Sequence, residues 1–220
     1  MSKIERRRIT CPKCGKQGEQ IVWASINVDL DPEAKKRIFN EDIFSWECPH
    51  CGLKVVAPFS TLYHNMEKKV MIYYFPRRSD DGTGLSSSKG HFPLQDDYIY
   101  RSVYNLYDFK EKIGILEAGL DDGAIELIKH MFLHDSRPEN LSQDVQYRFI
   151  GVGPGSESIS SKKSILLQCI EPGKGIIGVL PLPYDMYEGI VADRISERIF
   201  PLDADFPEVS QYVLKEMKKH

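Results

Sequence analysis

The sequence lacks any long apolar segment. No run of 18 or more apolar residues occurs in its 220 residues, so no segment has the composition of a transmembrane helix. The first eight residues carry four basic side chains, and no apolar stretch precedes the first cysteine, which argues against a secretory signal. We therefore expect no membrane insertion and no secretion, and we expect a cytoplasmic protein.

Net charge is also small. The chain has 29 Lys and Arg against 32 Asp and Glu, a formal net charge of −3, whereas a generic polyanion-binding domain is strongly basic. A small basic cluster consists of Lys3 and residues 6–8. Together with Lys13, Lys54 and Trp23 it leaves nucleic acid binding open as an alternative, through phosphate contacts and base stacking.

Cysteine is scarce, yet four of the five cysteines follow one pattern. They lie in the motifs CPKCG at residues 11–15 and CPHCG at residues 48–52. In a chain without a secretory signal, such pairs indicate metal binding rather than disulfides, because the cytosol keeps thiols reduced. Proline fixes φ after the first cysteine of each motif, and glycine tolerates a positive φ after the second. The pattern predicts one metal site with four thiolate ligands, which are Cys11, Cys14, Cys48 and Cys51.

We expect this metal to be one structural zinc ion. Four protein thiolates close a tetrahedral zinc site, whereas a catalytic zinc site keeps one position open for water. The sequence therefore predicts a protein that is not an enzyme. Thiolates in this geometry also suit a single iron, so a rubredoxin-like electron carrier stays open as an alternative. His50, inside the second motif, is expected to be a solvated turn residue, and Cys169, in an apolar run, a core residue.

With both CPxCG motifs in place, the sequence resembles the CpXC domain family of bacteria and archaea. The resemblance extends over roughly residues 9–135 and is also carried by residues 23–29, 62–69 and 120–126. It implies a zinc-binding ribbon with attached elements, in which the four motif cysteines are the ligands. It implies no established activity. From the closed metal site we expect an interaction module whose partner is another protein.

The segment patterns predict an α+β fold. We expect an N-terminal β-rich zinc ribbon with an insertion at residues 1–97, a helical hairpin packed on it at 98–144, and a small C-terminal β-rich α+β domain at 145–220. The composition of residues 77–90 predicts a mobile loop. Acidic residues of the hairpin are expected to form a solvated face. The expected strands span residues 21–28, 43–47, 54–59, 70–75, 145–152, 164–170 and 175–180, and the expected helices span 31–39, 101–118, 121–134 and 207–219.

Overall fold

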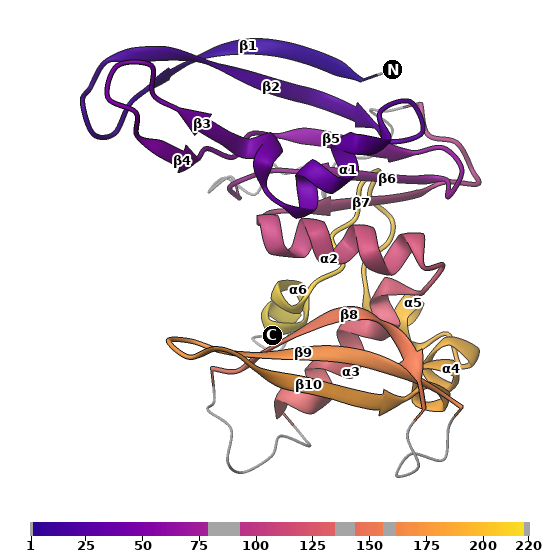
Figure 1. Ribbon diagram of the computed structural model, residues 1–220. Coiled ribbons are helices and arrows are strands. Elements are labelled where there is room, and N and C mark those ends of the chain that lie inside the picture. The colour runs from indigo at the N-terminus through magenta and orange to yellow at the C-terminus, as the bar shows by residue number, and fades with distance from the viewer. Residues whose placement is uncertain (1, 79–92, 135–143, 156–161, 218–220) are drawn as a thin grey trace. The chain divides into compact units, whose positions relative to one another are not determined.

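The computed structural model describes residues 2–78, 93–134, 144–155 and 162–217 (Figure 1). Contacts between residues divide the chain into two compact units. The first contains residues 1–110 and 204–206, and the second contains residues 111–203 and 207–220. The predicted division at residues 97 and 144 stays a prediction, because compactness alone does not show which segments fold independently. Most of the loop predicted at residues 77–90 lies outside the described residues.

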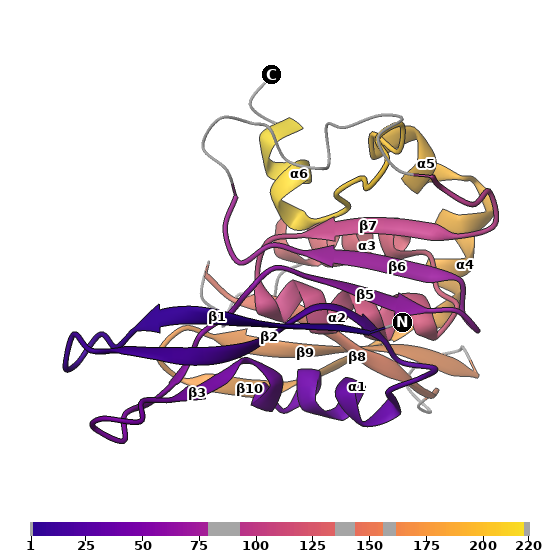
Figure 2. The same ribbon diagram turned by 90° about the horizontal axis from the view of Figure 1, so that it is seen from above.

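The first unit is built on a five-stranded mixed sheet in the order β1-β2-β5-β6-β7, seen from above in Figure 2. The β2–β5 and β6–β7 pairs are parallel, and the other two pairs are antiparallel. A separate hairpin pairs β3 with β4. The elements are β1 (Lys3–Thr10), β2 (Gln17–Asn27), α1 (Pro32–Phe39), a 3-10 turn η1 (Asp42–Phe44), β3 (Ser45–Glu47), β4 (Lys54–Val56), β5 (Thr61–Asn65), β6 (Val70–Tyr74) and β7 (Ile99–Val103).

Aromatic side chains fill the core of this unit. Tyr74 on β6 stacks on Phe109 with ring centroids 5.0 Å apart, and Phe44 lies 4.9 Å from Phe59. Alternate residues of β5 and β6 are buried, as expected for strands with one face on a core. Phe109 belongs to the first turn of α2 (Leu106–Glu117), and this turn is the part of the helix that lies within the first unit.

The helix predicted from residue 101 is wrong at its start. Residues 99–103 form β7, and α2 begins at Leu106. The N–H of Asp108 donates to the side-chain oxygen of Asn105 at 2.8 Å, which satisfies one of the unpaired N–H groups of the first helical turn. Residues 99–103 are extended because they pair with β6. The helix begins only after Asn105, whose side chain caps it.

The second unit packs helices on a three-stranded antiparallel sheet in the order β10-β9-β8. Its elements are α3 (Asp122–His134), β8 (Gln146–Pro154), β9 (Lys163–Glu171), β10 (Gly175–Pro183), α4 (Tyr184–Ala192), α5 (Ile195–Ile199) and α6 (Gln211–Met217). Apolar residues of α3, the sheet and α4 share one core, including Ile125, Leu167 and Ile190. Strands and helices in both units confirm the α+β class.

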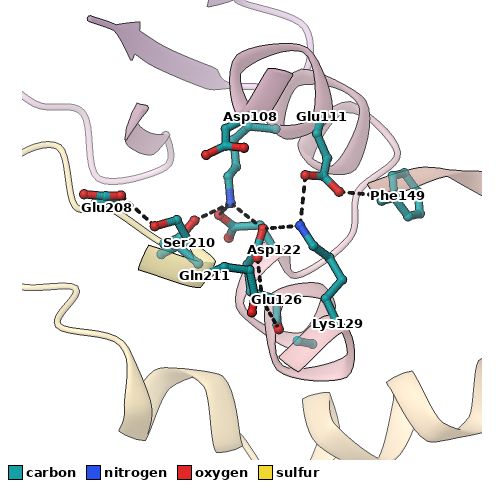
Figure 3. A network of polar contacts seen from close by, with 12 residues as sticks. Asp108, Glu111, Asp122, Glu126, Lys129, Phe149, Glu208, Ser210 and Gln211 are labelled. Carbon is teal, nitrogen blue, oxygen red and sulfur yellow. Dashed lines mark hydrogen bonds and ion pairs between the residues drawn. The ribbon is translucent and has the colours of Figure 1, made fainter. Parts of the chain in front are cut away.

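A buried network of charges lies in the second unit (Figure 3). The ammonium of Lys129 lies 2.9 Å from Glu111 and 3.0 Å from Glu126, and the ammonium of Lys112 lies 2.9 Å from Asp122. All five side chains are at most 8% exposed. The prediction that the acidic residues of the hairpin form a solvated face is therefore wrong for the three carboxylates. Buried lysines on the same two helices take the place of water as their partners.

Candidate metal centre

The two cysteine turns have the same backbone geometry. In the first, the N–H of Cys11 donates to the carbonyl of Lys16 at 2.9 Å, and that of Gly15 to the carbonyl of Cys11 at 3.0 Å. In the second, the corresponding bonds from Cys48 and Gly52 are also 2.9 and 3.0 Å long. The two glycines have φ of 69° and 67°, a left-handed conformation that side chains disfavour. The repeated motif thus encodes a repeated turn.

Two hairpins carry these turns to the same place. The first turn joins β1 to β2, and the second joins β3 to β4; both turns lie at one end of the first unit in Figures 1 and 2. The indole N–H of Trp46 on β3 donates to the carbonyl of Glu19 on β2 at 3.0 Å. A Cβ on Gly18 would lie only 2.8 Å from the Trp46 ring and 3.1 Å from Pro49. Because Gly18 has no side chain, Trp46 and Pro49 of the second hairpin can pack closely against β2.

The four sulfurs lie at the separations expected around one metal ion. Cys11 and Cys51 have their sulfurs 3.7 Å apart, as do Cys14 and Cys48, and all four lie within 4.8 Å of one another. A tetrahedral site with metal–sulfur bonds of about 2.3 Å has sulfurs about 3.8 Å apart. A disulfide would need about 2.05 Å, and all four cysteines are free thiols. The donor set fits a thiophilic metal ion.

The pKa values of two thiols of the cluster, Cys11 and Cys51, are shifted in opposite directions. Burial raises the pKa of Cys11, but hydrogen bonds from the backbone N–H groups of Cys14 and Lys13 outweigh it and lower that pKa to about 6. At Cys51 a backbone hydrogen bond at Leu53 lowers the pKa, while burial and the neighbouring sulfurs raise it to about 11. Four thiolates cannot share this volume without a compensating positive charge. The cluster is therefore electrostatically suited to a cation.

Two sides of the cluster differ in exposure. Cys11 and Cys48 are 1% and 2% exposed and pack with Trp46 in a small apolar cluster, whereas Cys14 is exposed and Cys51 half-buried. Few apolar residues pack against Cys11, Cys48 and Trp46; they are Ile9, Leu53, Val55 and Ala57. So small a core gives the ends of the two hairpins, which carry the cysteine turns, little hydrophobic support of their own.

The other candidate residues lie as follows. His50 is exposed, and its ring makes a 3.1 Å hydrogen bond with the carbonyl of Gln17. The ring therefore contacts the backbone at the start of β2, just after the first cysteine turn. Cys169 is buried in the core of the second unit, and burial raises the pKa of its thiol, which confirms the prediction of a core residue. Within the described ranges, the four motif cysteines are the group of metal-binding side chains that the fold brings together.

Sequence reasoning did not single out Gly18 and Trp46, which align the two hairpins. Trp46 lies two residues before Cys48 in a strand whose neighbouring residues are exposed. An aromatic side chain at that spacing from a cysteine turn was the available signal, but its partner on β2 is 27 residues away. Such a contact becomes visible only in the folded chain.

One comparison with known proteins, a match to a family model, covers the cysteine cluster. A family model described as CpXC protein matches residues 9–129, a range that includes both cysteine turns. No match to a curated protein or to a solved structure reaches significance. Among the described residues, no helix is long and apolar enough to cross a membrane.

Proposed function

The chain belongs to the CpXC protein family, and from its four-cysteine cluster we propose that it is a non-enzymatic interaction protein shaped by one structural zinc ion. The observation that carries this proposal is the set of four sulfurs within 4.8 Å of one another. Zinc bound there would supply a cross-link between the two hairpins and a positive charge for the thiolates. Cys11, Cys14, Cys48 and Cys51 would hold it, and they leave no ligand position open for catalysis.

The role in interaction rests on the size of the local core. Few apolar residues support the cysteine turns, and structural metal commonly replaces missing core in small β-ribbons. A pair of hairpins cross-linked by a metal ion would suit recognition of another macromolecule, and we propose a protein partner. Four free thiols with no disulfide suit a reducing compartment, which supports a cytoplasmic location.

Metal analysis tests the first part of this proposal. Tag-free protein, expressed without added metal and measured by inductively coupled plasma mass spectrometry, should contain one zinc per chain. Cys14→Ser should lose it, whereas Cys169→Ser, a matched change in the second unit, should retain it. Protein that carries no stoichiometric metal would refute the proposal.

Electron transfer is the second candidate. The exposed position of Cys14 favours it, because an electron carrier needs a short path from its metal to the surface. Iron on the same four thiolates would give a red protein with a reversible redox absorbance. Colourless protein that contains zinc alone after native expression would exclude this alternative.

Partner capture tests the role in interaction. Affinity capture under reducing conditions should recover the same protein partner with the wild type and with Cys169→Ser, and should lose it with Cys14→Ser. Equal capture by the zinc-free Cys14→Ser protein would show that recognition does not depend on the metal.

A further inference from the structure

Strand β1 is an open edge of the five-stranded sheet. It pairs with β2 on one side, and no strand in the described part of the chain pairs with its other side (Figures 1 and 2). Its register with β2 is regular from Ile4 to Thr10, with an irregularity only between Lys3 and Ile4. These residues contain no proline. About every second residue therefore directs an unpaired N–H and C=O away from the sheet.

Basic side chains cover both faces of this edge. Arg6 and Arg8 lie on one face and Arg7 on the other, because side chains alternate along a strand. All three are exposed, and the side chains of Arg6 and Arg7 are 77% and 53% accessible. Their ion pairs, Arg6 with Glu19 at 3.4 Å and Arg7 with Glu5 at 3.6 Å, are solvent-exposed and contribute little. An incoming carboxylate can therefore replace them.

Apolar side chains accompany the arginines on one face. In the β1–β2 register, Ile4 lies opposite Trp23 and Arg6 opposite Ile21. Ile4 and Ile21 are 55% and 59% exposed, which is high for isoleucine on a sheet. The edge thus combines backbone hydrogen-bonding groups, three positive charges and exposed apolar surface.

We propose that β1 is a docking edge that accepts an extended acidic segment of a partner protein as an added antiparallel or parallel strand. Strand addition uses the backbone for affinity and alternate side chains for specificity. The three arginines disfavour pairing of β1 with a second copy of itself, because like charges would meet. They favour a strand with carboxylates on both faces, since guanidinium and carboxylate form paired hydrogen bonds.

The surface fits an acidic peptide better than a single-stranded nucleic acid. Stacking needs an open aromatic face, and the Trp23 ring already has the guanidinium of Arg37 5.9 Å from its centroid. Glu5 and Glu19 lie within the same hairpin and would repel a continuous phosphate backbone, whereas a peptide can place its carboxylates selectively.

This inference rests on the proposed function, because β1 leads directly into the cysteine turn. Thr10 ends the strand and the next residue is Cys11, so a metal ion in the cluster would fix one end of the docking edge. Metal loss and charge reversal on β1 therefore affect binding by different routes.

The test uses the zinc-loaded 220-residue chain and a fluorescein-labelled decapeptide in which pairs of Glu alternate with pairs of Val, so that both faces of the added strand carry carboxylates. Binding is followed by fluorescence anisotropy. The acidic peptide should bind, and a version with Lys for Glu, or with proline at its centre, should not. The double variant Arg6→Glu with Arg8→Glu should weaken binding by about tenfold or more. The matched double variant Lys174→Glu with Lys215→Glu changes the charge equally at exposed positions of the second unit and should bind like the wild type.

Hydrogen exchange locates the peptide without any variant. Amides of residues 3–10 should gain protection when the acidic peptide binds, and zinc content should be the same in all variants. No binding of the peptide, protection confined to other segments, or equal binding by the Arg6→Glu and Arg8→Glu variant would overturn the inference. Tighter binding of a 20-nucleotide oligo-dT than of the peptide would also overturn it and would assign the edge to nucleic acid.

The outcome is separable from that of the proposed function. If the β1 variant retains zinc and captures the cellular partner as well as the wild type does, the docking edge is wrong and the proposed function stands. If Cys14→Ser captures the partner unimpaired, the proposed function fails whatever the peptide shows.

Discussion

After its metal is removed, the first unit should unfold at a markedly lower denaturant concentration. In the folded protein a metal ion on the four thiolates would join Cys14 to Cys48, which are 34 residues apart. The chain-entropy relation for a cross-link that closes a loop of this size gives about 4 kcal/mol of stabilisation. Metal–thiolate bonding adds to this value, since structural zinc sites show apparent binding energies of roughly 10 kcal/mol or more. We therefore expect a loss of at least about 4 kcal/mol.

The structure supplies a local optical probe for this experiment. The chain has two tryptophans, and both, Trp23 and Trp46, lie in the first unit. Trp46 packs against Cys11 and Cys48, so its fluorescence should report the opening of the cysteine turns. Urea titrations of metal-loaded protein and of protein stripped by a strong chelator should show separate midpoints under reducing conditions.

The result that would refute this reasoning is an unchanged midpoint. A total stability of about 5–15 kcal/mol is typical of a domain, so a loss of about 4 kcal/mol cannot pass unnoticed. Cys169→Ser leaves the cysteine turns intact and should retain the metal-dependent shift. If chelation moves neither the fluorescence midpoint nor the far-ultraviolet circular dichroism, the cluster is not a structural metal site.

Three further predictions concern contacts outside the four-cysteine cluster. Gly18→Ala places a Cβ 2.8 Å from the Trp46 ring and should lower the free energy of unfolding by roughly 1–3 kcal/mol. The variant should also retain zinc less well in a chelator competition. Unchanged retention would contradict the role of Gly18 in aligning the two hairpins. Lys129→Met leaves the buried carboxylate of Glu111 without its cation, while Glu126 keeps the ammonium of Lys112 at 3.8 Å. The change should cost about 3–5 kcal/mol in urea unfolding, whereas Lys36→Met, which breaks an exposed helical pair, should cost below about 0.5 kcal/mol. Burial raises the pKa of Glu111 above its ordinary 4.5, so the folded state holds this proton to higher pH than the unfolded chain does. The free energy of unfolding should then fall as pH rises through the raised pKa, and Glu111→Gln should flatten that slope; parallel slopes would refute the assignment.

Local patterns predicted much of the secondary structure. The helix expected at residues 31–39 is observed as Pro32–Phe39, and the C-terminal strands lie within a few residues of their expected bounds. Strand β1 was not predicted, because its sequence has three consecutive arginines and little apolar alternation. It is a strand through its pairing with β2, which is a partner that its own residues do not specify.

The amino-acid sequence by itself determined the cysteine turns. Each turn is encoded within five residues, where proline and glycine fix the backbone between two sulfurs, and the repeat of the same motif was enough to identify the four clustered thiols. Tertiary structure alone decided what surrounds them: the contact of Gly18 with Trp46, the open edge of β1, and the burial of Glu111 beside Lys129. Periodicity along one segment distinguishes polar from apolar faces, but whether a polar face meets water or a buried partner depends on residues distant in the chain.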